Sequence, residues 1–265
     1  VARHCLEYRV QTLPGALDKA KSYGYAGAFY AWESVEGGKD ACTDYNVTDV
    51  FTGRPMRTFF RDTQVHISAA VVYGLRKYTQ YTGDDSLLQS GGARVVLECA
   101  RFYMSLISKR ILSDTYDLLD VMGPDEYHEH VKNNAYTNEM ARNYAVEVCR
   151  KYLPETDTAE LMHFADAAKH LKHQTPDPKT GLIEQFDGYF KLENVLVPEV
   201  RSRLIDPREY WGGAYGVAAQ TQVIKQADVI ALLYMLGQYP AGIIAANYDY
   251  YEPRTEHGSS LSACM

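Results

Sequence analysis

Two neighbouring segments of this chain repeat apolar residues at helical spacing, and this pattern constrains the fold more than any other feature. In residues 65–81 one apolar stripe recurs at about 3.6 residues per turn; it consists of Val65, Ala69, Val72 and Tyr73. Thr82-Gly83-Asp84-Asp85 then ends the pattern. In residues 93–107 apolar residues nearly encircle the helix axis, so we expect this helix to lie deeper than its neighbour. Two consecutive helices with a short link predict a helical hairpin.

Further helical patterns alternate with long loops along the chain. We predict additional helices at residues 135–152, 158–170 and 220–236. Gly- and Pro-marked stretches separate the helices at residues 24–55, 123–134, 175–188 and 239–260. Loops longer than about 15 residues inside a compact domain are usually functional. Because strand-like alternation is scarce, we predict an all-α protein built from successive helical hairpins.

Composition excludes several classes of protein. The chain has 265 residues, of which 46% are apolar and 23% charged, which suits one large globular domain. Its 27 Lys and Arg residues stand against 34 Asp and Glu residues, so the net charge of -7 makes nucleic acid a poor partner. No apolar run reaches the ~18 residues that a membrane span needs.

The cysteines and the chain ends add two expectations. The cysteines are odd in number and scattered, without a C-x-x-C pair, which argues against a disulfide framework and fits a reducing compartment, the cytoplasm; they are Cys5, Cys42, Cys99, Cys149 and Cys264. The chain opens on an uncapped helical pattern at Val1, and a new helical pattern begins just before Met265. We therefore expect a piece of a longer protein.

Residues 121–130 form the densest cluster of ionisable groups. Pro124 follows Gly123 and restricts the backbone just before Asp125 and Glu126. Flanking apolar residues can raise the pKa of a carboxyl group, as a general acid requires. The alternative is an ordinary solvated acidic loop.

A metal site at the same cluster fails one test. A helical zinc protease needs His-Glu-x-x-His, and after His128-Glu129-His130-Val131 comes Lys132. His128 and His130 remain only as an isolated pair of possible ligands. We predict no metal ion.

Two polar groups on expected helices have open alternatives. The amides in Asn133-Asn134-Ala135-Tyr136-Thr137-Asn138 suit either helix caps or hydrogen bonds to sugar hydroxyls. Lys225 interrupts an apolar helical stretch, and a buried unpaired ammonium group is costly. Its partner is either Asp228, three residues later, or a ligand.

The chain ends with a candidate anion site. Residues 254–262 combine His257, Gly258 and several serines at the start of a helical pattern, where free backbone N–H groups can bind an anion. Ordinary helix caps are the alternative. No Gly-x-x-x-x-Gly-Lys loop or Gly-x-Gly-x-x-Gly fingerprint is present, so a nucleotide cofactor has no support.

These segments together resemble the catalytic core of glycoside hydrolase family 65, the group of maltose, kojibiose, nigerose and trehalose phosphorylases. The motifs follow the family order along nearly the whole chain: Leu13-Pro14-Gly15-Ala16, Gly24-Tyr25-Ala26-Gly27-Ala28, Trp32-Glu33-Ser34, His66-Ile67-Ser68-Ala69, Gly123-Pro124-Asp125-Glu126-Tyr127-His128-Glu129, Asn133-Asn134-Ala135-Tyr136-Thr137-Asn138, Lys225-Gln226-Ala227-Asp228-Val229 and His257-Gly258-Ser259-Ser260-Leu261-Ser262. The resemblance implies an (α/α)6 barrel that is incomplete in residues 1–265. The N-terminal β-sandwich and C-terminal β-domain of the family have no counterpart here, and a homodimer is implied by analogy only.

The resemblance also implies residue roles. Glu126 is similar to the general acid that protonates the glycosidic oxygen. Further positions resemble sugar-binding residues: Trp32, Glu33, His66, Tyr127, His128, Asn134, Lys225 and Gln226. His257, Ser259 and Ser260 resemble the phosphate-binding loop. The implied reaction is inverting phosphorolysis of an α-linked glucose disaccharide to β-glucose 1-phosphate and the acceptor sugar, with inorganic phosphate as co-substrate and no cofactor.

One departure from the family pattern leaves a second reaction open. Many members have Thr-Thr-His-x-Ser-Ser, whereas this chain has Glu256 directly before His257. An inverting α-glucoside hydrolase would use Glu126 as acid and Glu256 as base. We favour phosphorolysis because the histidine and both serines are kept and Arg254 adds positive charge. A third reading, an inactive binding scaffold, conflicts with the intact motifs.

Overall fold

A computed structural model describes residues 1–142 and 144–259. It divides into two compact units. The first unit consists of residues 1–42, 65–118 and 139–172, and the second consists of residues 43–64, 119–138 and 173–265. We describe each unit by itself.

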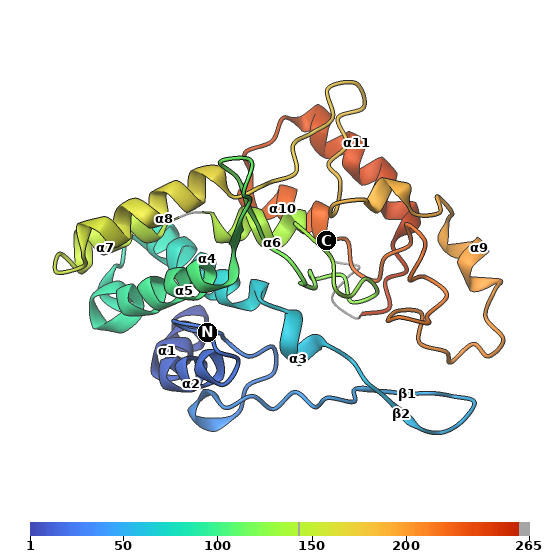
Figure 1. Cartoon of the computed structure of the whole chain (residues 1–265), viewed down its shortest axis with the longest axis horizontal. Coiled ribbons are helices and arrows are strands. Elements are labelled where there is room, and N and C mark those ends of the chain that lie inside the picture. The colour runs from blue at the N-terminus through green and yellow to red at the C-terminus, as the bar shows by residue number, and fades with distance from the viewer. Residues whose placement is uncertain (143, 260–265) are drawn as a thin grey trace. The chain divides into compact units, whose positions relative to one another are not determined.

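Helices dominate the secondary structure (Figure 1). The α-helices are α1 Ala2–Gln11, α2 Leu13–Ser22, α3 Phe60–Thr63, α4 His66–Thr82, α5 Ala93–Leu106, α6 Ala135–Ala141, α7 Ala145–Tyr152, α8 Thr158–His170, α9 Val197–Arg201, α10 Asp228–Leu236 and α11 Ala241–Tyr251. The strands form two antiparallel pairs, β1 Val47–Thr48 with β2 Pro55–Met56, and β3 Ser108–Lys109 with β4 Tyr116–Asp117. Shorter helical turns lie at Glu36–Gly38, Leu88–Gly92, Tyr189–Lys191 and Glu252–Arg254.

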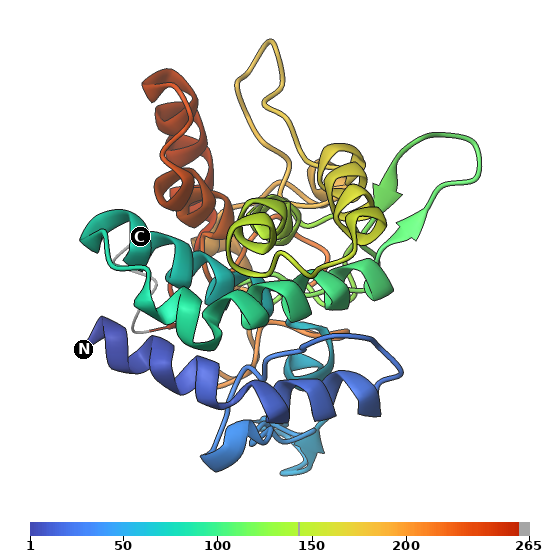
Figure 2. The ribbon, with the colours of Figure 1, turned by 90° about the vertical axis from the view of Figure 1, so that its left-hand side faces the viewer.

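The predicted hairpin is confirmed in the first unit. Helix α4 ends at Gly83, whose φ of 69° gives a left-handed cap that favours glycine. Helix α5 packs against α4 and is the more deeply buried, with eight of its 14 residues buried against six of 17 in α4. Helices α1 and α2 follow one another at Thr12 (Figure 2).

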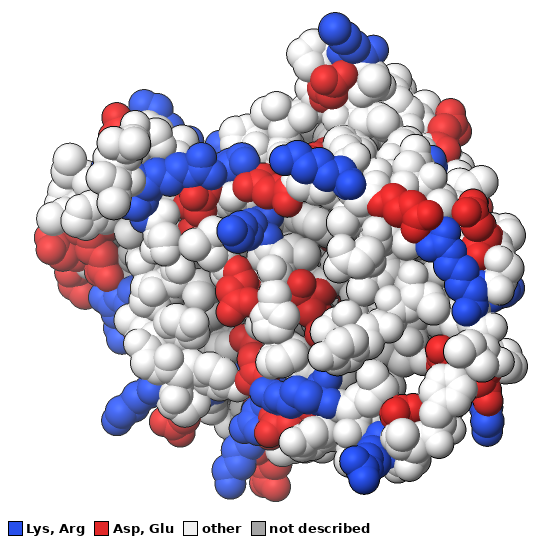
Figure 3. All heavy atoms as spheres, turned by 45° about the vertical axis from the view of Figure 1, so that its right-hand side comes forward, with Lys and Arg blue, Asp and Glu red and all other residues white. Residues whose placement is uncertain are grey.

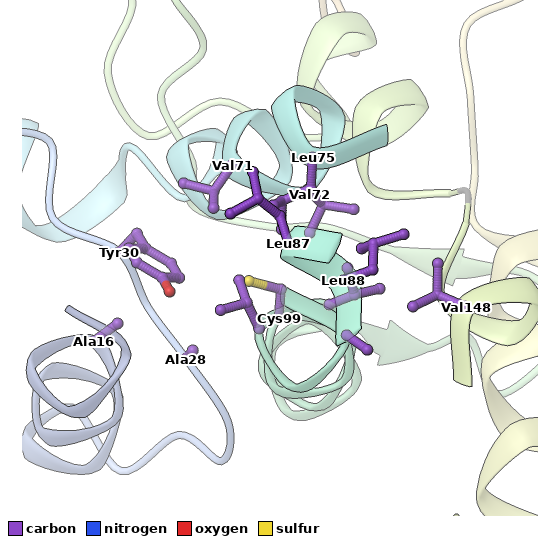
Figure 4. Packing of buried hydrophobic residues seen from close by; sticks show 13 residues of the cluster. Ala16, Ala28, Tyr30, Val71, Val72, Leu75, Leu87, Leu88, Cys99 and Val148 are labelled. Carbon is purple, nitrogen blue, oxygen red and sulfur yellow. The ribbon is translucent and has the colours of Figure 1, made fainter. Parts of the chain in front are cut away.

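One apolar core joins the helices of the first unit (Figure 4). Ala16 of α2, Leu75 of α4, Cys99 of α5 and Val148 of α7 belong to this cluster. Tyr30 enters it from the segment after α2, and its hydroxyl donates to the carbonyl of Arg9 at 2.7 Å. The packing therefore connects helices that are far apart in sequence.

Two helix predictions and one loop prediction differ from the structure. The segment 135–152 forms two helices, because Tyr144 has a φ of 94°, which a continuous right-handed helix cannot contain. The predicted helix at 220–236 begins only at Asp228. Residues 239–260, expected as a loop, contain α11. Helix α8 agrees with its prediction and begins with Asp157, whose carboxylate accepts the N–H of Ala159.

Long-range backbone pairing explains the missing first part of the 220–236 helix. The N–H of Ile224 donates to Arg254, and the N–H of Glu256 donates to Ile224, at 2.9 and 2.8 Å. The hydroxyl of Tyr189 donates to the carbonyl of Gln222 at 2.6 Å. Because these bonds use backbone groups that a helix would need, residues 220–227 do not form a helix.

The surface carries both signs of charge. On the face drawn in Figure 3, Lys and Arg side chains lie next to Asp and Glu side chains. Among the described residues, none of the helices combines the length and the apolar character that crossing a bilayer requires. The cysteines that the structure describes, Cys5, Cys42, Cys99 and Cys149, are free thiols.

Candidate active site

A short closed loop in the second unit holds the acidic cluster. Val121 and Val131 exchange backbone hydrogen bonds of 3.1 and 2.8 Å, which close the loop at its base. Within it Asp125 is 1% exposed and Glu126 is 8% exposed. The solvated acidic loop considered as an alternative is therefore wrong. Buried carboxyl groups require specific partners.

Asp125 is the centre of this loop. Its Oδ1 accepts the backbone N–H groups of Tyr127 and Lys225 at 3.1 and 2.8 Å. Its Oδ2 lies 2.6 Å from Nδ1 of His128 and accepts Nε2 of Gln185 at 3.1 Å. Four donors satisfy this carboxylate, so Asp125 fixes both the loop and the segment that carries Lys225.

The surroundings of His128 favour its charged form. Its Nε2 lies 2.9 Å from the carbonyl oxygen of Thr221, which can only accept, so this nitrogen donates. Burial opposes the charged ring, but the Asp125 carboxylate outweighs it and raises the pKa of His128 above its usual value. Both ring nitrogens are thus engaged, which makes His128 unsuitable as a metal ligand. Within residues 1–142 and 144–259 there is no cluster of three or more residues able to hold a metal ion.

Glu126 is positioned from several sides. The ammonium group of Lys225 contacts its Oε2, and the two side chains are 19% and 10% exposed. The backbone N–H of Glu126 donates to Oε1 of Gln226 at 3.2 Å, and its carbonyl accepts the hydroxyl of Tyr210 at 2.7 Å. Lys225 therefore pairs with Glu126. Helical spacing had suggested Asp228 as the partner.

Asn134 serves the fold directly. Its Oδ1 accepts the N–H of Thr137 at 2.9 Å, which caps α6. Its Nδ2 donates to Oδ2 of Asp228 at 2.8 Å. Of the two alternatives for this amide, the structure supports the helix cap.

The segment before the candidate phosphate loop meets the acidic loop through Tyr127. The hydroxyl of Tyr127 donates to Oε2 of Glu256 at 3.1 Å. Burial and the charge of Glu256 both raise the pKa of Tyr127, which keeps its hydroxyl a donor. Arg201 lies 3.7 Å from the other oxygen of Glu256. Both carboxylate oxygens of Glu256 thus face a side chain of the second unit, Tyr127 at Oε2 and Arg201 at Oε1.

The remaining predicted residues belong either to the candidate phosphate loop or to the first unit. His257, with a φ of 58°, and Ser259 follow Glu256, whereas Ser260 and the helical pattern after it lie outside the described residues. Trp32, Glu33 and His66 belong to the first unit, where Trp32 is half-buried, Glu33 is exposed and His66 is buried at the start of α4. The structure thus brings together six predicted residues in the second unit: Glu126, Tyr127, His128, Asn134, Lys225 and Gln226.

Several residues around the candidate site were not marked by any sequence motif. The guanidinium group of Arg254 donates to Asn194 and to the carbonyl of Tyr250. Arg201 faces Glu256, and no motif in the sequence marked this arginine. Tyr210 and Gln185, which hold the acidic loop, also lie outside every motif.

The whole chain, residues 1–265, matches the family model described as the glycosyl hydrolase family 65 central catalytic domain. The chain therefore belongs to this family. It is similar to a nigerose phosphorylase of Lachnoclostridium phytofermentans, with 56% identity covering 100% of this chain and 37% of that protein. It is also similar to a 1,2-alpha-glucosylglycerol phosphorylase of Bacillus selenitireducens, with 41% identity covering 99% of this chain and 36% of that protein.

A solved structure from the human microbiome, provisionally assigned as a kojibiose phosphorylase, is similar in fold. It superposes with a TM-score of 0.81 at 26% identity, covering 98% of this chain and 38% of that chain. This chain spans somewhat more than a third of the length of each of these proteins.

Proposed function

We propose that this chain provides part of the catalytic domain of an inverting phosphorylase. Its substrates are an α-linked glucose disaccharide and inorganic phosphate, and its products are β-glucose 1-phosphate and the acceptor sugar. The observation that carries the proposal is the buried Glu126 in contact with the Lys225 ammonium group. The phosphorylase names of the similar proteins support the same reaction.

Each group near Glu126 has a role in this proposal. Protonated Glu126 donates its proton to the glycosidic oxygen, and the ammonium of Lys225 then stabilises the carboxylate that remains. Tyr127, Lys225 and Gln226 contact the bound glucose. His128 and Asn134, whose polar atoms are engaged by the fold, act by positioning the loop.

Phosphate attacks the anomeric carbon from the face opposite the leaving oxygen. His257, Ser259 and Ser260 bind it, as their motif implies. For Trp32, Glu33 and His66 of the first unit, we propose a sugar-binding role from their motifs. Because phosphate is itself the nucleophile, the reaction needs no second carboxylate and no cofactor.

The hydrolase alternative depends on Glu256 as the base. Its carboxylate already accepts the Tyr127 hydroxyl and faces Arg201. A carboxylate engaged in this way is better suited to orienting the phosphate loop than to abstracting a proton from water. Glu256 therefore acts as a structural group in our proposal.

The wider assembly is part of the same proposal. The helix-rich units belong to an (α/α)6 barrel completed by further chain, next to the N-terminal β-sandwich and C-terminal β-domain of the family. A homodimer and a cytoplasmic location remain predictions from the resemblance and from the free thiols.

The direct test is an assay of the full-length protein with nigerose and kojibiose, with and without phosphate. We expect β-glucose 1-phosphate to form only with phosphate. Replacing Ser259 and Ser260 by Ala removes donors to an anion, so the KM for phosphate rises about tenfold or more. Glu256→Gln keeps phosphorolysis largely intact. Release of free glucose without phosphate, abolished by Glu256→Gln, would support the hydrolase instead.

A further inference from the structure

Two neighbouring buried carboxyl groups, Asp125 in the acidic loop and Asp228 beside it, have opposite surroundings. Asp125 has the four donors described above. Asp228, the first residue of α10, is 0% exposed, and its Oδ2 accepts Nδ2 of Asn134 at 2.8 Å. Its buried Oδ1 has no hydrogen-bond partner within the part of the chain that the structure describes. A buried carboxylate with one oxygen unsatisfied is strongly disfavoured.

Gln185 supplies the complementary unsatisfied atom. This side chain is 1% exposed and donates its Nε2 to Oδ2 of Asp125 at 3.1 Å. Its Oε1 is buried and also has no partner among the described residues. The side chain of Gln185 also interacts with the Asp228 carboxyl group, and by itself this interaction lowers the pKa of Asp228. Because both unsatisfied atoms are acceptors, one proton between them would serve both.

Electrostatics favours a proton at this position. Burial, and then the negative charge of Asp125, raise the pKa of Asp228 to about 7. Other titratable groups that face Asp228 are His128, Tyr189 and Tyr251. The cation His128 is committed to Asp125 at 2.6 Å, and the tyrosines are neutral at pH 7 because burial raises the pKa of each.

We propose that Asp228 is a neutral carboxylic acid and a positioning residue, with a proton on Oδ1 that is donated to Oε1 of Gln185. This bond keeps the amide N–H of Gln185 directed at Asp125. Asp125 in turn holds the backbone N–H groups of Tyr127 and Lys225, which are the residues beside and opposite Glu126. The protonation stands by itself, whereas its effect on catalysis rests on the proposed phosphorylase function.

The proposal predicts a loss of activity with rising pH. When Asp228 ionises, the carboxamide of Gln185 faces two carboxylates, and its buried Oε1 loses the donor that the proton on Asp228 supplied. The loop that carries Glu126 then loses one of its supports. Phosphorolysis should therefore fall as the pH rises through about 7, the pKa of Asp228.

The experiment compares the same chemical change at the two carboxyl groups of the full-length protein. Asp228→Asn keeps the size of the side chain and supplies an N–H for Oε1 of Gln185. We expect it to keep kcat within about threefold near pH 6 and to lose the fall around pH 7. Asp125→Asn removes an ionised acceptor of four donors, so we expect at least a 100-fold loss of kcat or a failure to fold.

Two readouts need no enzyme activity. The wild-type infrared spectrum near pH 6 should contain a carboxylic-acid carbonyl band that Asp228→Asn removes. Between about pH 4 and 7, Asp228 binds a proton in the folded protein that it has released in the unfolded protein. The folding equilibrium constant of the wild type should therefore fall as the pH rises. For each pH unit, this fall should be up to tenfold larger than in Asp228→Asn.

The outcomes separate this proposal from the proposed function. Equal damage by Asp228→Asn and Asp125→Asn, an unchanged pH profile of activity, or no difference in the infrared band would overturn it. If Asp228→Asn fails to fold near pH 6, the neutral state is also overturned, because a neutral isostere should fit. If the band and the stability difference are present but phosphate is not consumed, the proposed reaction is wrong while the protonation of Asp228 holds.

Discussion

The ammonium group of Lys225 contacts Oε2 of Glu126, 99 residues earlier in the chain. Both side chains are more than four-fifths buried, and Asp125 holds the backbone N–H of Lys225 beside them. The non-helical segment that carries Lys225 and the acidic loop thus meet at one charge pair. Removing either charge leaves the other poorly solvated, which makes the pair open to a direct test.

A double-mutant cycle measures how strongly the two residues depend on each other. We expect Lys225→Met and Glu126→Gln each to lower the unfolding free energy, and the double variant to lose less than the sum. The coupling energy should be about 0.5–3 kcal/mol, as for residues in direct contact. Urea unfolding gives the values. The exposed pair Lys109 and Asp114 is the control and should show no measurable coupling. Additive losses at Lys225 and Glu126 would contradict the pairing.

The assignment of Glu126 as the acid has its own test. Glu126→Gln should lower phosphorolysis of an unactivated disaccharide at least about 100-fold, because general-acid assistance typically contributes ~10²–10⁴. A substrate whose leaving group needs no proton should recover much of the rate. A variant that keeps more than about a tenth of wild-type turnover on the disaccharide would show that another group is the acid.

Gly123 tests how closely the loop packs. A Cβ atom there would lie 2.5 Å from Nδ2 of Asn134 and 2.7 Å from Oδ2 of Asp228, both buried. We expect Gly123→Ala to lower the unfolding free energy by about 1–3 kcal/mol and to reduce activity. The control is Gly242→Ala in α11, where an added Cβ meets nothing and the helix gains up to about 1 kcal/mol. Equal thermal stability of the two variants would contradict the close packing.

His128 makes stability depend on pH. Because Asp125 raises the pKa of folded His128, their pair stabilises the fold fully below the unfolded pKa of about 6.5. That contribution is lost as the pH rises through the higher folded pKa. Urea unfolding above about pH 6.5 should therefore show falling stability in the wild type and a flatter profile in His128→Gln. The exposed His163→Gln variant should keep the wild-type slope, and a matching slope in His128→Gln would refute the ion pair.

Local pattern was sufficient for part of the fold. The periodicity of residues 65–81 and 93–107 predicted α4 and α5, because amphipathic spacing reflects which face of a helix packs on the core. It failed at residues 220–227, where pairing with residues 254–256 replaced the local helical bonds. It also failed at Tyr144, whose left-handed backbone conformation ends the helical continuity without a glycine or proline to signal it.

For the site, the motif around Glu126 could be recognised from its residues, but the partners of those residues could not. The side-chain types and their order along the chain are written in the sequence, so the family, the proposed acid Glu126 and Lys225 could be recognised from it. Which atoms meet depends on contacts between segments up to about a hundred residues apart, and no local rule specifies them. Only the tertiary structure showed that Lys225 pairs with Glu126, that the acidic loop is buried, and that Gln185 donates to Asp125. The reason is physical, since burial and charge pairing are properties of the folded environment and not of the residue types.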